Sequence, residues 1–116
     1  MSYVQGFLVA VPVERKEEYR AMAQEMWPYF KSLGAISTTE CWQDDVADGE
    51  VTSFPMAVKL EEGEAVVFSW IIWPDAATYQ SAFEAMMNDP EMADMEMPFD
   101  GSRMLWGGFK PFFEGA

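Results

Sequence analysis

The chain contains no histidine, and this absence excludes several kinds of site. Ser-His and Cys-His nucleophile pairs need an imidazole as the general base. Histidine-ligated zinc, the two-histidine site of non-haem iron and haem with a proximal histidine need the same ring as a metal ligand. We therefore expect a protein that uses no metal and no cofactor.

Cysteine is nearly absent as well. Cys41 is the one cysteine, so the chain forms no internal disulfide, and a reducing compartment is the natural location. The N-terminal residues lack the basic region of a secretory signal. No apolar run approaches the roughly 20 residues that are needed to cross a bilayer. A cytoplasmic protein without a membrane anchor is expected.

Basic residues are few and scattered. Seven lysines and arginines stand against twenty acidic residues, which gives a net charge of −13. Binding to nucleic acid or to an anionic membrane relies on clustered cations that neutralise phosphates. The sequence therefore predicts neither of these partners, and the acidity is typical of a surface that keeps a protein in solution.

Apolar residues are abundant, and one stretch dominates them. Half of the 116 residues are apolar, which is enough for the core of a single domain over residues 1–116. Within residues 66–73, only Ser69 is polar. A strand alternates its side chains between two faces. One set is Val66, Phe68, Trp70 and Ile72, and the other is Val67, Ser69, Ile71 and Trp73. Neither set suits water, so both faces of this strand need cover.

The flanking patterns predict the order strand, helix, strand, short insert, strand, helix, strand. The expected strands cover residues 3–11, 35–43, 66–73 and 103–109, and the expected helices cover residues 13–33 and the segment between Asp75 and Asn88. Residues 52–60 fit either a strand or a short helix. Ser53 as N-cap and Pro55 in the first turn favour the helix.

This order predicts an α+β, ferredoxin-like βαββαβ fold with a short insert. In such a fold both helices cover one face of an antiparallel sheet, and the other face stays bare. Because the residues of the bare face are apolar, we expect a second copy of the chain to cover it across a two-fold axis. The product is a homodimer in the form of a dimeric α+β barrel.

Four segments of the chain form a recognisable set. They are Tyr3-Val4-x-Gly6-Phe7, Glu40-Cys41-Trp42, Val66-Val67-Phe68-Ser69-Trp70 and Met97-Pro98-Phe99-Asp100-Gly101-x-Arg103-Met104-x-x-Gly107-Gly108-Phe109. Together they resemble the YbaA-like bacterial family, catalogued as domain of unknown function 1428. The resemblance runs nearly end to end and implies the dimeric α+β barrel superfamily. That superfamily includes small monooxygenases, haem-degrading enzymes, chlorite dismutases and proteins like muconolactone isomerase. The resemblance implies no particular activity for this chain.

The candidate catalytic residues are Glu40 and Arg103. Glu40 is a lone acid in an apolar or neutral strand, and a half-buried carboxylate has a raised pKa unless a cation pairs with it. Arg103 is the expected partner, with Asp100 close enough along the chain to meet it. Arg103 would bind a carboxylate or enolate while Glu40 acts as the base. The alternative is a structural ion pair between two strands.

Aromatic residues supply the candidate substrate site. We expect Trp42, Trp70, Phe99, Asp100 and Trp106 to line a pocket for a flat ligand. The alternative is that the indole rings only fill the core and the dimer interface. Three functions stay open: a cofactor-free monooxygenase- or isomerase-like enzyme on a small aromatic or carbonyl compound, a non-catalytic dimer that binds a small ligand, and a structural module without a pocket.

Overall fold

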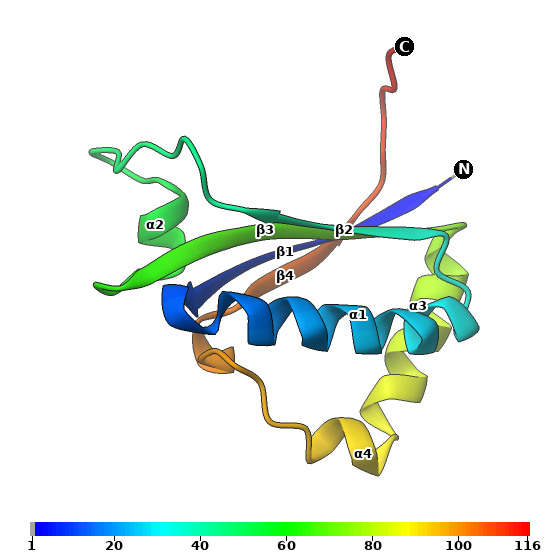
Figure 1. Ribbon diagram of the computed structural model, residues 1–116. Helices are drawn as coiled ribbons and strands as arrows, with labels where there is room; N and C mark the ends of the chain where they lie inside the picture. The colour runs from blue at the N-terminus through cyan, green and yellow to red at the C-terminus, as the bar shows by residue number, and fades with distance from the viewer. Residues whose placement is uncertain (1) are drawn as a thin grey trace.

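A four-stranded antiparallel sheet with the strand order β2-β3-β1-β4 organises the molecule. The computed structural model describes residues 2–116 (Figure 1). The strands are β1 (Tyr3–Pro12), β2 (Ser37–Trp42), β3 (Glu64–Trp73) and β4 (Leu105–Phe109). The α-helices are α1 (Lys16–Ser32), α2 (Phe54–Ala57), α3 (Ala76–Met87) and α4 (Pro90–Ala93), with 3₁₀ turns η1 (Val13–Arg15) and η2 (Gly101–Arg103). This order and pairing confirm the ferredoxin-like α+β prediction.

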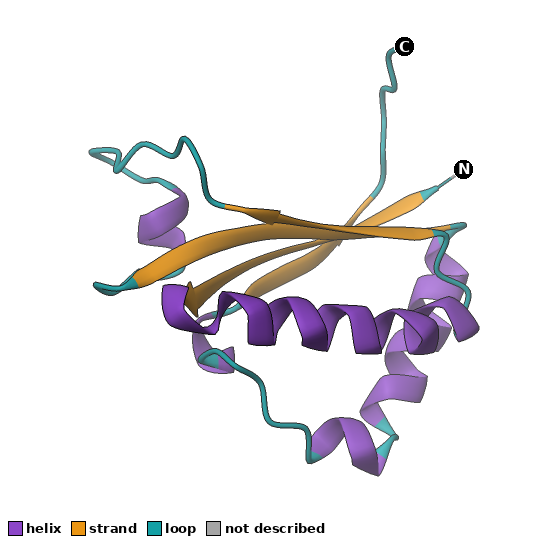
Figure 2. Cartoon of the chain, viewed as in Figure 1, coloured by secondary structure: helices purple, strands orange, loops and turns teal. Residues whose placement is uncertain are grey.

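The helices lie mostly on one side of the sheet. Figure 2 shows α1, α3 and α4 below the strands, while the loop that contains α2 rises at one end. Among residues 2–116, no helix is long and apolar enough to pass through a membrane.

Side-chain caps explain where the shorter helices begin. The carboxylate of Asp75 accepts a hydrogen bond of 2.7 Å from the Thr78 backbone N–H at the start of α3. The hydroxyl of Ser53 accepts one of 3.1 Å from the Met56 N–H, and Pro55 lies in the first turn of α2. Each cap satisfies an N–H that has no partner within the helix. The segment that fitted either strand or helix therefore forms the helix.

One glycine connects α1 to β2 past the start of α3. Gly34 has a φ of +111°, which side chains rarely tolerate, and a Cβ there would lie 2.6 Å from Thr78 Cγ2. The chain can turn at Gly34 because this residue has no side chain to collide with Thr78 of α3.

The alternation along β3 is confirmed. Val67, Ser69, Ile71 and Trp73 are all buried on the helix side, where the rest of the core is gathered. On the other side, only the end next to α2 is covered, by contacts among Ala10, Val58 and Val66.

We call the uncovered part of that second side the open sheet face. The strand register places on it Val4, Leu8, Phe68, Trp70, Ile72, Leu105 and Phe109. Phe68 is 46% exposed, Leu105 40% and Phe109 63%. The C-terminal residues 110–116 rise from the sheet on this same side (Figure 1) and carry Phe112 and Phe113, which are 100% and 81% exposed.

The last strand begins later than expected. Arg103 was predicted to begin a strand over residues 103–109, but it lies in η2, and β4 begins at Leu105. The cause is Asp100, whose carboxylate accepts hydrogen bonds from the backbone N–H and the hydroxyl of Ser102, at 3.0 and 2.6 Å. These bonds hold the backbone in a turn until Met104.

Candidate small-molecule site

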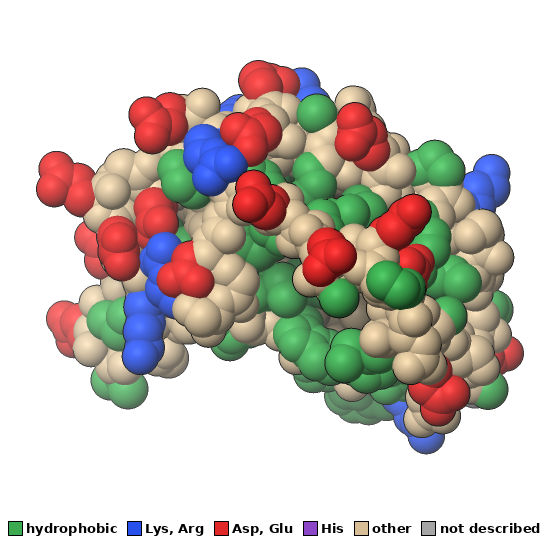
Figure 3. All heavy atoms as spheres, turned by 90° about the horizontal axis from the view of Figure 1, so that it is seen from below, with side chains coloured by type: hydrophobic (Ala, Val, Ile, Leu, Met, Phe, Trp, Pro, Cys, Tyr) green, Lys and Arg blue, Asp and Glu red, His purple; other side chains and the backbone are tan. Residues whose placement is uncertain are grey.

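A cavity of about 440 Å³ lies between the sheet and the helices. Its walls are mostly apolar, and seven methionines contribute to them: Met22, Met26, Met86, Met87, Met92, Met97 and Met104. Viewed from the helix side, hydrophobic side chains gather in a hollow, and acidic side chains are scattered around it (Figure 3). Ligand sites of small proteins have this size and this mainly apolar character.

Glu40 and Tyr19 form the polar centre of this cavity. The Tyr19 phenol on α1 donates a hydrogen bond of 2.7 Å to Glu40 Oε1 on β2. The strand register places Glu40 opposite Ser69, which is 2% exposed, on the central strand β3. Desolvation raises the pKa of Glu40, and hydrogen bonding to Tyr19 and Ser69 offsets part of that rise. Burial, followed by the charge of Glu40, raises the pKa of Tyr19, so the phenol stays protonated as a donor.

Other polar groups of the cavity wall already have partners within the chain. Gln5 Oε1 accepts a hydrogen bond of 3.1 Å from the Trp73 indole N–H. Thr38 donates its hydroxyl hydrogen to the backbone carbonyl of Trp70 at 3.1 Å. The carboxylate of Glu40 has two oxygens, about four acceptor positions, and Tyr19 and Ser69 use no more than two of them. Glu40 is therefore the strongest acceptor that the cavity offers to a ligand.

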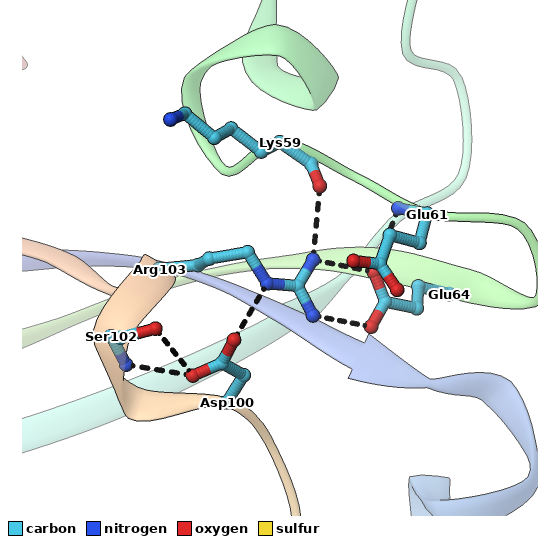
Figure 4. A network of polar contacts seen from close by, with 6 residues as sticks. All are labelled: Lys59, Glu61, Glu64, Asp100, Ser102 and Arg103. Atoms are coloured by element: carbon cyan, nitrogen blue, oxygen red, sulfur yellow. Dashed lines mark hydrogen bonds and ion pairs between the residues drawn. The ribbon is translucent and has the colours of Figure 1, made fainter.

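The predicted pair between Glu40 and Arg103 is wrong. Arg103 instead makes a bidentate pair with Glu64, with nitrogen–oxygen distances of 2.8 and 2.7 Å (Figure 4). Its Nε donates to Asp100 at 3.1 Å, which confirms that these two residues meet locally, and Nη1 also donates to the Lys59 carbonyl at 2.9 Å. The guanidinium lowers the pKa of Glu64. This network ties the turn before β4 to the start of β3, so Arg103 pairs with Glu64 and not with Glu40 in either of the two expected roles.

The aromatic candidates divide between three places. Phe99 and Trp106 line the cavity, where the Phe99 ring lies 5.8 Å from Tyr19 and Trp106 stacks on Phe83 at 5.3 Å. Trp42 lies in a neighbouring groove between α1 and β2. Trp70 was wrongly grouped with them, because it lies on the open sheet face, with its ring 5.4 Å from Phe68.

Sequence reasoning missed Tyr19 and Ser69 as site residues. Tyr19 falls in the apolar stripe of α1 and looks like ordinary core. Ser69 carried a usable signal, because it is the single polar residue in the most apolar strand and shares the face of Glu40. Among residues 2–116, no three acidic or cysteine side chains are grouped to hold a metal ion. The expectation that the protein uses no cofactor stays a prediction.

Replacing Glu40 with glutamine is expected to stabilise the protein at neutral pH. The pKa of Glu40 in the folded state is above its ordinary value of about 4.3. The stability that protonated Glu40 contributes is therefore fully present below about pH 4.3, and it is lost as the pH rises through the folded-state pKa. Glutamine keeps an acceptor for Tyr19 without the charge. In thermal melts, Glu40→Gln should raise the melting temperature by a few degrees at pH 7 and above. This increase should become smaller toward pH 4. Glu25→Gln, at an exposed position on α1, is the control. A gain that does not change with pH would contradict this cause.

The fold and the cavity together define a class of protein, a ferredoxin-like α+β domain with an apolar cavity between its sheet and its helices. The family model described as "Protein of unknown function (DUF1428)" matches residues 2–101, and the chain belongs to this family. The resemblance inferred from the sequence is thereby confirmed.

Two relatives are 51% identical to this chain over 116 residues, which is 98% of this chain and 99% of each relative. Both carry the name "Uncharacterized protein YbaA", one from Escherichia coli (strain K12) and one from Shigella flexneri. Among solved structures, "De novo designed protein Foldit4" is similar with a TM-score of 0.44 and 14% identity over 94% of each chain.

Proposed function

We propose that this protein binds a compact, largely apolar molecule with one hydrogen-bond donor in the cavity between its sheet and its helices. The observation that carries the proposal is the Glu40 carboxylate, held by Tyr19 at 2.7 Å on the wall of an apolar cavity of about 440 Å³. The residue as a whole stays exposed, but its carboxylate is partly desolvated on the side that meets Tyr19, where a further donor would stabilise its charge. A phenol, enol or N–H group of a ligand is such a donor, while the methionines adapt to its apolar body.

Naphthol and its methyl ether test this proposal, because they share an apolar body and differ in the donor. Naphthol is expected to bind about tenfold more tightly, since a hydrogen bond to a charged acceptor contributes about 1.5 kcal/mol or more. Quenching of tryptophan fluorescence, supported by calorimetry, measures both affinities. Met22→Trp, which fills the cavity from α1, should abolish binding of both compounds, and Glu40→Leu should abolish only the preference. Equal affinities in the wild type, or none, would refute the proposal.

A second candidate is catalysis at the same place. The raised pKa of Glu40 favours it, because a general base works best when its pKa is near the working pH. Glu40 would take a proton from a substrate hydroxyl or an activated C–H, in a cofactor-free monooxygenase- or isomerase-like enzyme on a small aromatic or carbonyl compound. Quinols and lactones, incubated in air, are the substrates to screen. Turnover that falls at least about a hundredfold in Glu40→Gln would support this candidate.

The proposal includes a homodimer in which two open sheet faces pack against each other. Phe68, Leu105 and Phe109 leave too much apolar surface exposed for a sheet that stays single. A second copy of the chain is the partner that we propose for the open sheet face. The C-terminal residues 110–116 extend beyond the same face and add two more exposed phenylalanines, which a second copy would also cover. A stable interface of this kind buries more than roughly 1,000 Å². A cytoplasmic location fits the free Cys41.

A further inference from the structure

A second hollow, the outer groove, lies outside the apolar cavity. It has a volume of about 550 Å³ and runs between α1 and the edge strand β2. Four residues line both spaces and separate them: Tyr19, Ala23, Thr38 and Glu40. The groove has a character of its own, because its other wall residues include cations and indole rings instead of methionines.

Two cations face this groove without strong partners. Lys16 and Arg20 are four residues apart on α1, so they share one side of the helix. Within residues 2–116, Lys16 forms no ion pair, and its Nζ lies 4.9 Å from the centre of the Trp42 ring. Arg20 has only Glu17, at 3.6 Å, and both side chains are more than half exposed, so this pair contributes little.

The remainder of the charge distribution makes this pair of cations unusual. The chain carries a net charge of −13, and Arg15 and Arg103 are both paired with carboxylates. An anion is therefore repelled by most of the surface, and the two cations of this groove are the feature that would attract it. Trp42 and Trp27 add flat apolar faces to the same groove, on which an aromatic ring can lie.

We propose that the outer groove is a binding site for a small aromatic carboxylate, with Lys16 and Arg20 on the carboxylate and Trp42 beside the ring. The site is separate from the apolar cavity and stands whether or not that cavity binds a ligand. Charge complementarity sets the class of ligand, because a neutral aromatic of the same shape gains nothing from the two cations.

Glu40 opposes this binding, so substitutions of Glu40 and of the two cations should change the affinity in opposite directions. Its carboxylate lies in the shared wall, so its negative charge repels a carboxylate in the groove. Removing that charge should tighten binding, whereas removing either cation should weaken it. A groove that bound aromatic rings by packing alone would respond to neither change.

Anthranilate and its neutral counterpart anthranilamide are the probes. The fluorescence of anthranilate and calorimetry measure binding to the full chain at neutral pH. Lys16→Met and Arg20→Gln are each expected to weaken anthranilate binding about tenfold, and Glu40→Gln to strengthen it about threefold. Lys31→Met, which removes an exposed cation of the same helix outside the groove, should leave the affinity unchanged.

The proposal fails if anthranilamide binds as tightly as anthranilate, if Lys16→Met binds like Lys31→Met, or if anthranilate does not bind at millimolar concentration. Met22→Trp separates this result from the first proposal, because Met22 lines only the apolar cavity. Anthranilate binding that disappears in Met22→Trp would assign the probe to the apolar cavity and overturn the outer site.

Discussion

Replacing Phe68 with aspartate is expected to dissociate the proposed homodimer into a monomer of lower stability. Phe68 is central on the open sheet face, with its ring 6.0 Å from Phe54 and 5.4 Å from Trp70, and it is 46% exposed in the single chain. In the monomer the new carboxylate reaches water. In the proposed dimer the two-fold axis would bury two such charges, each at a cost of several kcal/mol. The dimer dissociation constant should rise by about a thousandfold or more.

Sedimentation equilibrium over a wide range of protein concentration measures this change. Ala85→Asp adds the same charge to the exposed side of α3 and should leave the wild-type dimer intact. Circular dichroism shows whether the Phe68→Asp monomer keeps its secondary structure. A wild-type chain that sediments as a folded monomer at micromolar concentration would contradict the proposed dimer directly.

Replacing Arg103 with methionine is expected to have the largest effect on stability of any single change in the polar network. The side chains of Arg103 and Glu64 are only 14% and 10% exposed, although the pair lies close to the surface, so the substitution leaves a partly buried carboxylate without its cation. Removing one partner of such a pair is destabilising, and the melting temperature should fall by several degrees. Adding Glu64→Leu to this variant should recover much of the loss, because the orphaned charge is then removed.

The pH dependence provides a further check on this network. Hydrogen bonding to Arg103 lowers the pKa of Glu64, so the stability it contributes is present above the ordinary pKa and is lost as the pH falls through the folded-state value. The difference in melting temperature between the wild type and Arg103→Met should therefore become smaller at acidic pH. Lys110→Met, which removes an exposed cation after β4, is the control. A similar loss in that control would show a response to net charge instead of to the network.

Local patterns predicted the elements and faces of this fold well. The alternation of residues 66–73 separated the two sets of side chains that lie on opposite faces, because a shift of one residue would move the entire pattern to the other face. It did not tell which of the two sets lies under the helices. Asp75 and Ser53 marked helix starts because a cap needs only its near neighbours along the chain.

The partners of Glu40 and Arg103 depended on information that no local pattern contains. Glu64 is 39 residues before Arg103 and meets it because β3 begins beside the turn before β4, a matter of strand register. Tyr19 reaches Glu40 from a helix whose rotation about its axis is fixed only by packing. The error over Trp70 was avoidable, since the same alternation that placed Glu40 opposite Ser69 places Trp70 on the other face.

The seven methionines around the apolar cavity have a consequence for how this space can change shape. A thioether side chain has three rotatable bonds and no branch, so it can change shape while the backbone stays in place. Exchange of a single methionine for leucine or phenylalanine would remodel the space and leave the sheet, the caps and the Arg103 network untouched. The wall is therefore the part of the molecule in which new ligand preferences can arise at the smallest cost to folding.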